Sequence, residues 1–263
     1  MNRSAPISLQ YRLWKTLAAG LALAGEAVVR PGLRILSYHA VGTELPGDPY
    51  GLSMPPDGFQ RQMELLATGR FGAVVSLSQA RLDGLSPEVC VTFDDGYLDT
   101  LSTAAPVLAR LKLPFTVCVT PKLLESGAPH MTPGQLKELA LMPGAEIGAH
   151  GFSHRSLPAC DDAALKQELS DSRAWLQSRL GKPVTVMTYP HGHADQRVRK
   201  AAETAGFARA GCSRYALNGP DRDPLLLCRT EIVAWDTERT FAQKVSGGWD
   251  FFRFRHTDPA RIW

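Results

Sequence analysis

The stretch VTFDDGYLDT, residues 91–100, places two aspartates side by side where a β-branched and aromatic run gives way to glycine. The run before them predicts a buried β-strand that ends at Asp94. The segment from Leu98 to Leu111 predicts the helix that follows, with Pro106 as a local break. Two like charges at a strand end repel each other unless a cation lies beside them. This stretch therefore predicts a strand, a helix and a cation site at their junction.

The same order of strand and helix recurs along the chain. Strands are predicted in RILSYHAVG from Arg34, EVCVTF from Glu88, PFTVCVT from Pro114, AEIGAH from Ala145, VTVMTYPHG from Val184, FARAGC from Phe207 and LCRTEIVAWD from Leu227. Helical patterns lie between them, such as the one at 59–67 and the one that begins with Thr132 as N-cap and Pro133 as its first residue. Such alternation in one domain predicts an α/β fold, a parallel (β/α) barrel of about seven strands.

Several polar residues fall at the carboxyl ends of these predicted strands: His39, Asp94, Asp95, His150 and His191. In a parallel barrel, functional side chains gather at this end of the strands. Segments far apart in the sequence are therefore expected to meet at one mouth.

The composition excludes some classes of protein. The 263 residues are 44% hydrophobic, enough for a large core, and the formal net charge of +3 comes from basic residues spread along the chain. Nucleic acid is therefore not expected as a partner. The five cysteines are an odd number and widely spaced, so they form neither a disulfide framework nor a C-x-x-C zinc site.

The two ends differ from the middle. Residues 1–30 contain Arg12 and Lys15 before an apolar run. That run of about ten residues is too short to span a bilayer. It predicts an amphipathic helix that packs on the domain or touches a membrane surface, with a weak signal-like segment as the alternative. Residues 31–246 form the predicted domain and 247–263 an aromatic and basic tail. The cysteines and the weak signal favour the cytoplasm or the cytoplasmic membrane face over the periplasm.

The motif HGFSH supplies the groups that two aspartates need. The spacing of His150 and His154 can bring both imidazoles to one side of a helical turn. Two histidines and one carboxylate form a three-ligand zinc site with a position open for an acidic water. One aspartate can then bind the metal while the other takes a proton. Each motif alone is also compatible with surface histidines or an ordinary turn, but their joint occurrence at strand ends favours the site.

The sequence TFDDGY, followed further along by IGAHGFSHRSL, resembles the polysaccharide deacetylase family, also called the NodB-homology domain or carbohydrate esterase family 4. The resemblance covers roughly 34–245 and implies a distorted (β/α) barrel. It implies that Asp94 is the general base and that Asp95, His150 and His154 bind a divalent metal, most often Zn²⁺. The implied substrate is an N-acetylated glycan, whose acetamide is hydrolysed to acetate and a free amine.

The segment TYPHG departs from the family pattern, in which Arg-x-Pro-Tyr lines the groove. Tyr189, Pro190 and Gly192 match, whereas His191 replaces the usual aromatic residue and the arginine is absent. The resemblance still implies that these four residues bind substrate and that backbone groups of the loop contribute to an oxyanion hole.

The general acid also departs from the common pattern. Typical members end with Leu-x-His, whose histidine protonates the leaving amine, and no such motif follows His193. The opening LSYHAVG is similar to a permuted branch that includes biofilm poly-N-acetylglucosamine deacetylases, which makes His39 the candidate acid; a core histidine is the alternative. LLLCRTEI resembles that branch's Leu-Pro-Arg-Ile and points to Arg229, which would hold Asp94 ionised or form an ordinary ion pair.

The sequence thus predicts a metal-dependent hydrolase of carbon–nitrogen, non-peptide bonds, acting on an N-acetylated polysaccharide or oligosaccharide. Two alternatives are another metal-dependent amide hydrolase on the same scaffold and an inactive carbohydrate-binding module. The presence of the base and all three ligands disfavours the inactive module.

Overall fold

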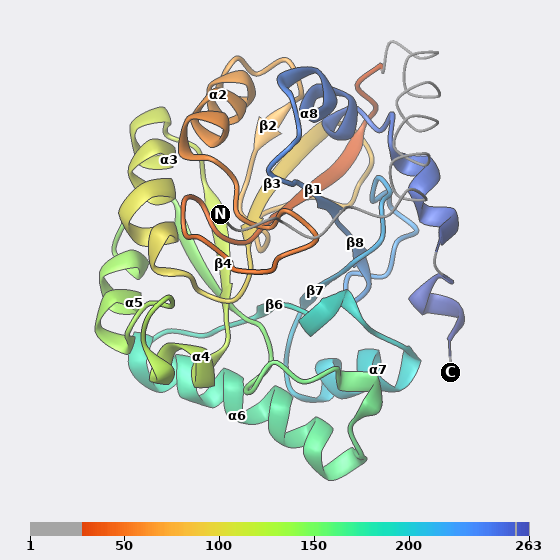
Figure 1. The fold of residues 1–263 in the computed structure, drawn as a ribbon. Helices are drawn as coiled ribbons and strands as arrows, with labels where there is room; N and C mark the ends of the chain where they lie inside the picture. Colours follow the sequence, from red (N-terminus) through yellow and green to blue (C-terminus); the bar gives the residue numbers. More distant parts are fainter. Residues whose placement is uncertain (1–27, 256, 263) are drawn as a thin grey trace.

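The core of the protein is a parallel sheet curled into a nearly closed barrel (Figure 1). A computed structural model describes residues 28–255 and 257–262. Within them, eight strands follow one another in the order β8-β7-β6-β5-β4-β3-β1-β9, every pair parallel. They are β1 (Gly32–Tyr38), β3 (Pro87–Phe93), β4 (Phe115–Val119), β5 (Ala145–Ala149), β6 (Val186–Thr188), β7 (Arg209–Cys212), β8 (Leu227–Cys228) and β9 (Thr230–Glu231); β2 (Ala73–Val74) pairs with β3 off this path. The α/β barrel is confirmed, with eight strands rather than seven.

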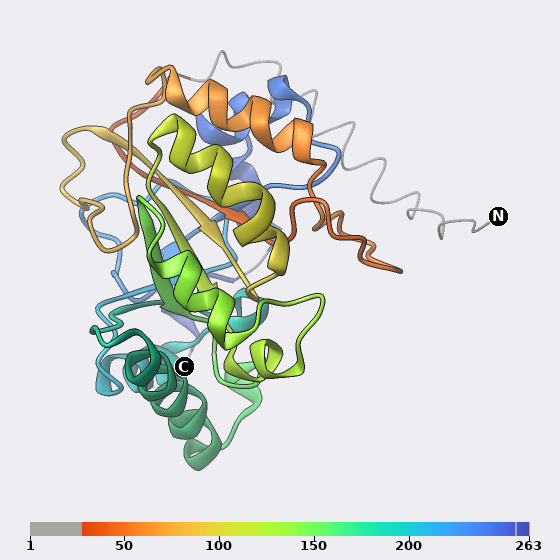
Figure 2. The same ribbon diagram turned by 90° about the vertical axis from the view of Figure 1, so that its left-hand side faces the viewer.

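Helices cover the outside of the barrel. They are α2 (Pro56–Ala67), α3 (Ala105–Leu111), α4 (Pro121–Ser126), α5 (Pro133–Ala140), α6 (Asp162–Leu180), α7 (Gln196–Thr204) and α8 (Glu238–Val245). Helix α2 packs between α8 and α3, and α6 packs between α5 and α7, so that the helices surround the sheet (Figures 1 and 2). None of the helices in the described part of the chain is long and apolar enough to cross a membrane.

The local signals read from the sequence account for several helix boundaries. Thr132 and Gln135 form a reciprocal capping box at the start of α5. Gly181 takes a left-handed conformation with φ 66° at the end of α6, as a helix-ending glycine does. The helix expected from Leu98 to Leu111 is divided into a π-helical segment, Thr100–Ala104, and α3, with Pro106 just inside α3.

The barrel closes through a single residue. Strands β8 and β9 lie at opposite ends of the strand order, yet only Arg229 separates them in the chain. The segment expected to be one late strand is therefore broken, because β8 pairs with β7 whereas β9 pairs with β1. The chain changes partner at Arg229, and this seam places its side chain where the two ends of the sheet meet.

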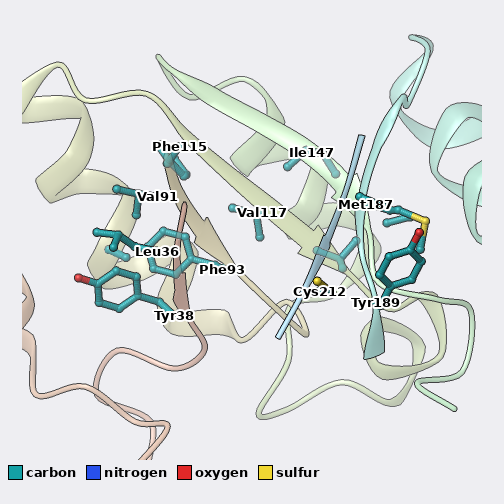
Figure 3. Packing of buried hydrophobic residues seen from close by; sticks show 14 of the residues in the cluster. Leu36, Tyr38, Val91, Phe93, Phe115, Val117, Ile147, Met187, Tyr189 and Cys212 are labelled. Carbon is teal, nitrogen blue, oxygen red and sulfur yellow. The ribbon is translucent and has the colours of Figure 1, made fainter. Parts of the chain in front are cut away.

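Alternation along the strands divides the core in two. One apolar cluster lies inside the barrel: Leu33, Ile35, Leu77, Ala80, Cys90, Val186 and Leu227. A larger cluster packs between the sheet and the helices (Figure 3). Its labelled members include Tyr38, Phe93 and Tyr189, which alternate along their strands with inward-facing residues. The residue next to each of these three, His39, Asp94 and Thr188, accordingly faces the barrel axis.

The two ends of the chain fall partly outside the description. Residues 1–27, which contain most of the expected amphipathic or signal-like segment, lie outside the described residues. In the tail, the 3₁₀-helix Asp250–Arg255 is joined to β1 by the ion pair of Asp250 with Arg34, and the 3₁₀-helix Pro259–Arg261 contacts α7. Trp249 is buried before them, and Phe254 is exposed.

Candidate metal centre and catalytic site

Three ligand atoms converge at the mouth of the barrel. Asp95 follows β3, His150 follows β5 and His154 lies one turn further on. The Oδ1 atom of Asp95 is 3.5 Å from Nε2 of His150 and 3.2 Å from Nε2 of His154. Metal–ligand bonds of about 2.0–2.1 Å at a tetrahedral angle separate ligand atoms by about 3.3 Å. The two separations match the spacing that one zinc ion requires.

The protonation states also fit a metal. Oδ1 of Asp95 is buried and has no hydrogen-bond partner among the described residues, which leaves its lone pairs free. Nδ1 of His150 lies 3.0 Å from the carbonyl oxygen and 2.7 Å from Oγ1 of Thr188, so it carries the proton and donates. Nε2 is then the unprotonated nitrogen, as expected of a histidine ligand anchored by a second group.

The backbone holds two of the three ligands in an uncommon conformation. Asp95 has φ 70° and His154 has φ 63°, in the left-handed region that residues other than glycine seldom adopt. Such strain persists only where the surrounding structure enforces it, and it is concentrated at functional sites.

Glu168 on α6 enforces the conformation of the HGFSH loop. Its Oε2 accepts hydrogen bonds from the amides of Phe152 at 2.8 Å and Ser153 at 2.9 Å, and the Ser153 hydroxyl donates to Oε1. The carboxylate is almost fully buried. A helix outside the barrel therefore fixes the turn that directs His154 toward Asp95.

Burial and mutual charge set the titration of the three ligands. Burial raises the pKa of Asp95, but His154, His150 and His39 outweigh it, so the pKa lies below its usual value. Burial lowers the pKa of His150 to about 4, although both aspartates oppose the shift. His150 is therefore neutral at physiological pH and can offer a lone pair. For His154, Asp95 outweighs the effect of burial and raises the pKa.

Asp94 faces the other way, into the barrel, where Arg229 meets it. Nη1 of Arg229 donates to Oδ1 at 2.9 Å and Nη2 pairs with Oδ2 at 2.8 Å; Thr188 Oγ1 donates to Oδ1 at 2.8 Å. Burial raises the pKa of Asp94, but Arg229, His150 and His39 together lower it to about 2. The group is an oriented carboxylate at neutral pH.

His39 lies at the end of β1, half-buried beside both aspartates, since its charge lowers the pKa of each. Its Nδ1 is buried without a hydrogen-bond partner in the described chain. Asp99 fixes the loop that follows, because its Oδ2 accepts from the amides of Val41 and Thr43, both at 2.8 Å. The structure thus brings His39 and Arg229 to the same centre as the two aspartates and the two histidines.

The TYPHG segment reaches this centre mainly through His191. Its ring lies 4.5 Å from that of His154, at an interplanar angle of 67°. Tyr189 is fully buried with its hydroxyl donating to the carbonyl of Leu225 at 2.7 Å, and Pro190 is also buried. At Gly192, which has φ 68°, a Cβ would lie 2.0 Å from that of Ser213, so only glycine fits.

The backbone of this segment is largely committed to the fold. The amides of Tyr189, Gly192 and His193 donate to the carbonyls of Gly211, Tyr189 and Pro190. Pro190 has no amide hydrogen, and the amide of His191, with φ 59°, has no such acceptor in the described structure. Any oxyanion donor from this loop is therefore the His191 amide.

Sequence reasoning missed three features of the site. Thr188 joins His150 to Asp94, Glu168 holds the HGFSH loop, and Tyr97 stacks on His130 beside the ligands. Thr188 could have been found from strand alternation, because Tyr189 faces outward. The contacts of Glu168 and the stack of Tyr97 on His130 join distant segments, and no local sequence pattern predicts them.

The fold and the site define a class: a nearly closed parallel α/β barrel of the NodB-like deacetylase kind, with a candidate Asp-His-His metal site at its mouth. A family model described as polysaccharide deacetylase matches residues 83–210, which include both aspartates and both histidine ligands. The match spans just under half of the chain, and it shows that this part of the chain is similar to that family. The permuted branch stays a prediction.

Individual proteins show the same similarity. YxkH of Bacillus subtilis (strain 168), whose name places it among the polysaccharide deacetylases, is 28% identical over 180 residues; the match spans 66% of this chain and 62% of that relative. The Streptococcus pyogenes deacetylase PplD, solved in complex with acetate, has a TM-score of 0.72 at 23% identity, covering 82% of this chain and 99% of PplD. IcaB from Ammonifex degensii has a TM-score of 0.69 at 22% identity, covering 83% and 97%. At these identities the two structures show the fold alone.

Proposed function

We propose that this protein is a metal-dependent deacetylase that hydrolyses the acetamide of N-acetylated sugars in a polysaccharide or oligosaccharide. The observation that carries the proposal is the division of labour between adjacent aspartates. Asp95 turns toward two histidines at metal-ligand spacing, and Asp94 turns toward Arg229. A buried carboxylate beside a three-ligand site is the arrangement that metal-assisted hydrolysis requires.

Asp95, His150 and His154 would hold the divalent cation, and their nitrogen and oxygen donors favour Zn²⁺. When bound, such an ion polarises a carbonyl oxygen and lowers the pKa of water. The Asp94 carboxylate is the proposed general base, since it is ionised and Thr188 joins it to the metal ligand His150. Arg229 and Thr188 fix its plane, so that it does not rotate away from the attacking water.

The remaining groups are proposed to stabilise charge and deliver a proton. The amide of His191 is the proposed donor to the oxyanion that develops on the acetyl group. His39 is the proposed general acid for the leaving amine, because an imidazole changes charge near neutral pH and this one has a ring nitrogen without a partner in the described chain.

The acid role of His39 has its own test. His39→Ala should lower kcat on an N-acetylglucosamine oligomer by about 100-fold. Activity toward an activated acetate ester, such as 4-nitrophenyl acetate, should fall far less because its leaving group needs no proton. An unchanged kcat on the oligomer would exclude His39 as the acid.

An acetate-release assay tests the function as a whole. Purified protein loaded with zinc is incubated with N-acetylglucosamine oligomers, with peptidoglycan and with small non-sugar amides, each with and without chelator. Chelator-sensitive release of acetate from a glycan is the expected result. Hydrolysis confined to small amides would instead identify another amide hydrolase, and stoichiometric zinc binding without any acetate release would identify an inactive carbohydrate-binding module.

A further inference from the structure

Two segments far apart in the sequence place an imidazole against a phenol ring at the mouth. The ring centroids of Tyr97 and His130 are 4.7 Å apart, with an interplanar angle of 27°. Tyr97 lies two residues beyond Asp95, whereas His130 precedes α5. Both side chains are half-buried, so part of each remains accessible.

The backbone clamps these rings together. Tyr97 and His130 form an antiparallel bridge, flanked by hydrogen bonds from Leu98 to Pro129 at 3.0 Å and from Met131 to Gly96 at 2.9 Å. Gly96 permits the approach: its φ is 86°, and a Cβ there would lie 2.8 Å from a methyl group of Leu124. The stack is therefore built by the main chain and does not arise from two surface side chains that happen to meet.

The stack lies directly beside the candidate metal centre. The charges of Asp95 and His154 act on the pKa of His130, which burial lowers. The pair thus begins two residues beyond the ligand Asp95, at the mouth of the barrel where a substrate must enter.

We propose that the Tyr97–His130 stack is a sugar subsite, which receives the ring of the N-acetylated hexose whose acetamide is cut. This inference rests on the proposed deacetylase function and deepens it. Sugar rings pack their C–H faces on aromatic rings, and their hydroxyl groups need hydrogen-bond partners, because a polar group buried without one is costly. The stack supplies both: a ring surface and polar edges.

The polar edges can be assigned to atoms. Nδ1 of His130 is buried, which leaves Nε2 as the ring nitrogen that can reach a sugar hydroxyl. The Tyr97 hydroxyl is a second group that can donate or accept a hydrogen bond. Neither atom takes part in the proposed transfer of a proton to or from the acetamide, so the stack acts by positioning.

Variants of His130 distinguish a role in substrate positioning from a role in the chemical step. His130→Ala should raise the KM for N-acetylglucosamine oligomers about tenfold, the size expected for loss of one hydrogen bond and one ring contact, while changing kcat little. Hydrolysis of 4-nitrophenyl acetate, which lacks a sugar, should be unaffected. His130→Gln, whose amide can still donate, should recover part of the KM.

A direct binding measurement tests the subsite without relying on turnover of the substrate. In the zinc-loaded Asp94→Asn background, calorimetry with N-acetylglucosamine oligomers should show about tenfold weaker binding when His130→Ala is added. Zinc content and the thermal midpoint report whether the variant is folded; if His130→Ala unfolds, His130→Gln against the parent decides. Equal affinity and equal KM in an active enzyme would overturn the subsite alone. Absence of acetate release from every glycan by the unmodified protein would instead overturn the proposed function and the subsite with it.

Discussion

At the scale of single residues, the paired aspartates avoid mutual repulsion because each faces a different partner. The left-handed conformation of Asp95, φ 70°, and the turn closed by the Gly96 amide on the Asp94 carbonyl at 2.8 Å direct the two side chains apart. Asp94 then reaches a guanidinium, and Asp95 reaches two imidazoles. Without these distant partners, two adjacent charges at a buried strand end would be strongly unfavourable.

Asp94→Asn is the change that separates base from ligand. Asparagine keeps an oxygen for Thr188 but cannot take a proton, so turnover should fall about 100- to 10,000-fold. Zinc stoichiometry, measured by atomic spectroscopy, should be retained because the three ligands are untouched. Asp95→Asn is the matched control and should lose zinc. An Asp94→Asn protein with a substantial share of wild-type turnover would show that the base is another residue.

The sequence predicted which residues meet at the mouth because alternation and strand ends are local properties. His39, Asp94 and His150 each end a strand at an inward-facing position, and the structure brings them together. The direction of the Tyr189 side chain was harder to predict. Alternation turns it outward to the core, and the side chain of this segment that lies beside the ligand His154 is that of His191.

At the scale of elements, α6 does more than cover the sheet. Its buried Glu168 is an anionic acceptor for the amides of Phe152 and Ser153, the two residues that precede His154. The sequence showed where α6 begins and ends, through Asp161 and Gly181, but Glu168 looks like any acidic residue of a surface helix. Only the packing of α6 against the loop distinguishes it.

Glu168→Ala should loosen the loop. Two partly buried amides lose their acceptor, which should lower the free energy of unfolding by about 1 to 3 kcal/mol. Zinc affinity, measured by competition with a chromophoric chelator, should fall about 10- to 100-fold, as for other groups that orient a ligand. Glu138→Ala, an equivalent change at an exposed position of α5, is the control and should alter neither. Unchanged zinc affinity in Glu168→Ala would show that His154 is oriented by other contacts.

The seam of the barrel marks the limit of sequence reasoning about elements. LCRTEIVAWD alternates as one strand, and nothing local shows that its two halves pair with opposite ends of the sheet. That division depends on closure of the whole barrel, because β8 and β9 are the two ends of the sheet. The same closure brings Arg229 to Asp94, which sequence reasoning reached through resemblance rather than through pairing.

At the scale of the whole molecule, an ion pair at the base of the barrel fastens the tail. Arg34, on β1, donates from Nη1 and Nη2 to the two carboxylate oxygens of Asp250 at 2.7 and 3.0 Å. It also donates to the carbonyl of Val245 and to Oγ1 of Thr230. One buried guanidinium therefore joins β1, β9, the end of α8 and the 3₁₀-helix Asp250–Arg255.

Asp250→Ala should destabilise the entire barrel rather than the tail alone. Arg34 is only 3% exposed, so removal of its carboxylate leaves a buried charge without its ionic partner. Breaking such a pair should lower the free energy of unfolding by about 2 to 3 kcal/mol, because two other acceptors of Arg34 remain. The thermal midpoint should fall by several degrees in a single transition. Asp57→Ala removes an aspartate from the exposed pair with Arg61, in which the side chains are 72% and 51% exposed, and should change stability by less than about 0.5 kcal/mol.

A double variant identifies the buried charge as the cause. Arg34→Met combined with Asp250→Leu removes both charges and keeps apolar volume at the base of the barrel. Replacement of a buried pair by apolar residues is often neutral or stabilising, so the double variant should be more stable than Asp250→Ala alone. If the double variant is equally destabilised, the loss comes from the bonds of Arg34 to the Val245 carbonyl and Thr230, and the strands at the seam depend on those bonds more than on the ion pair.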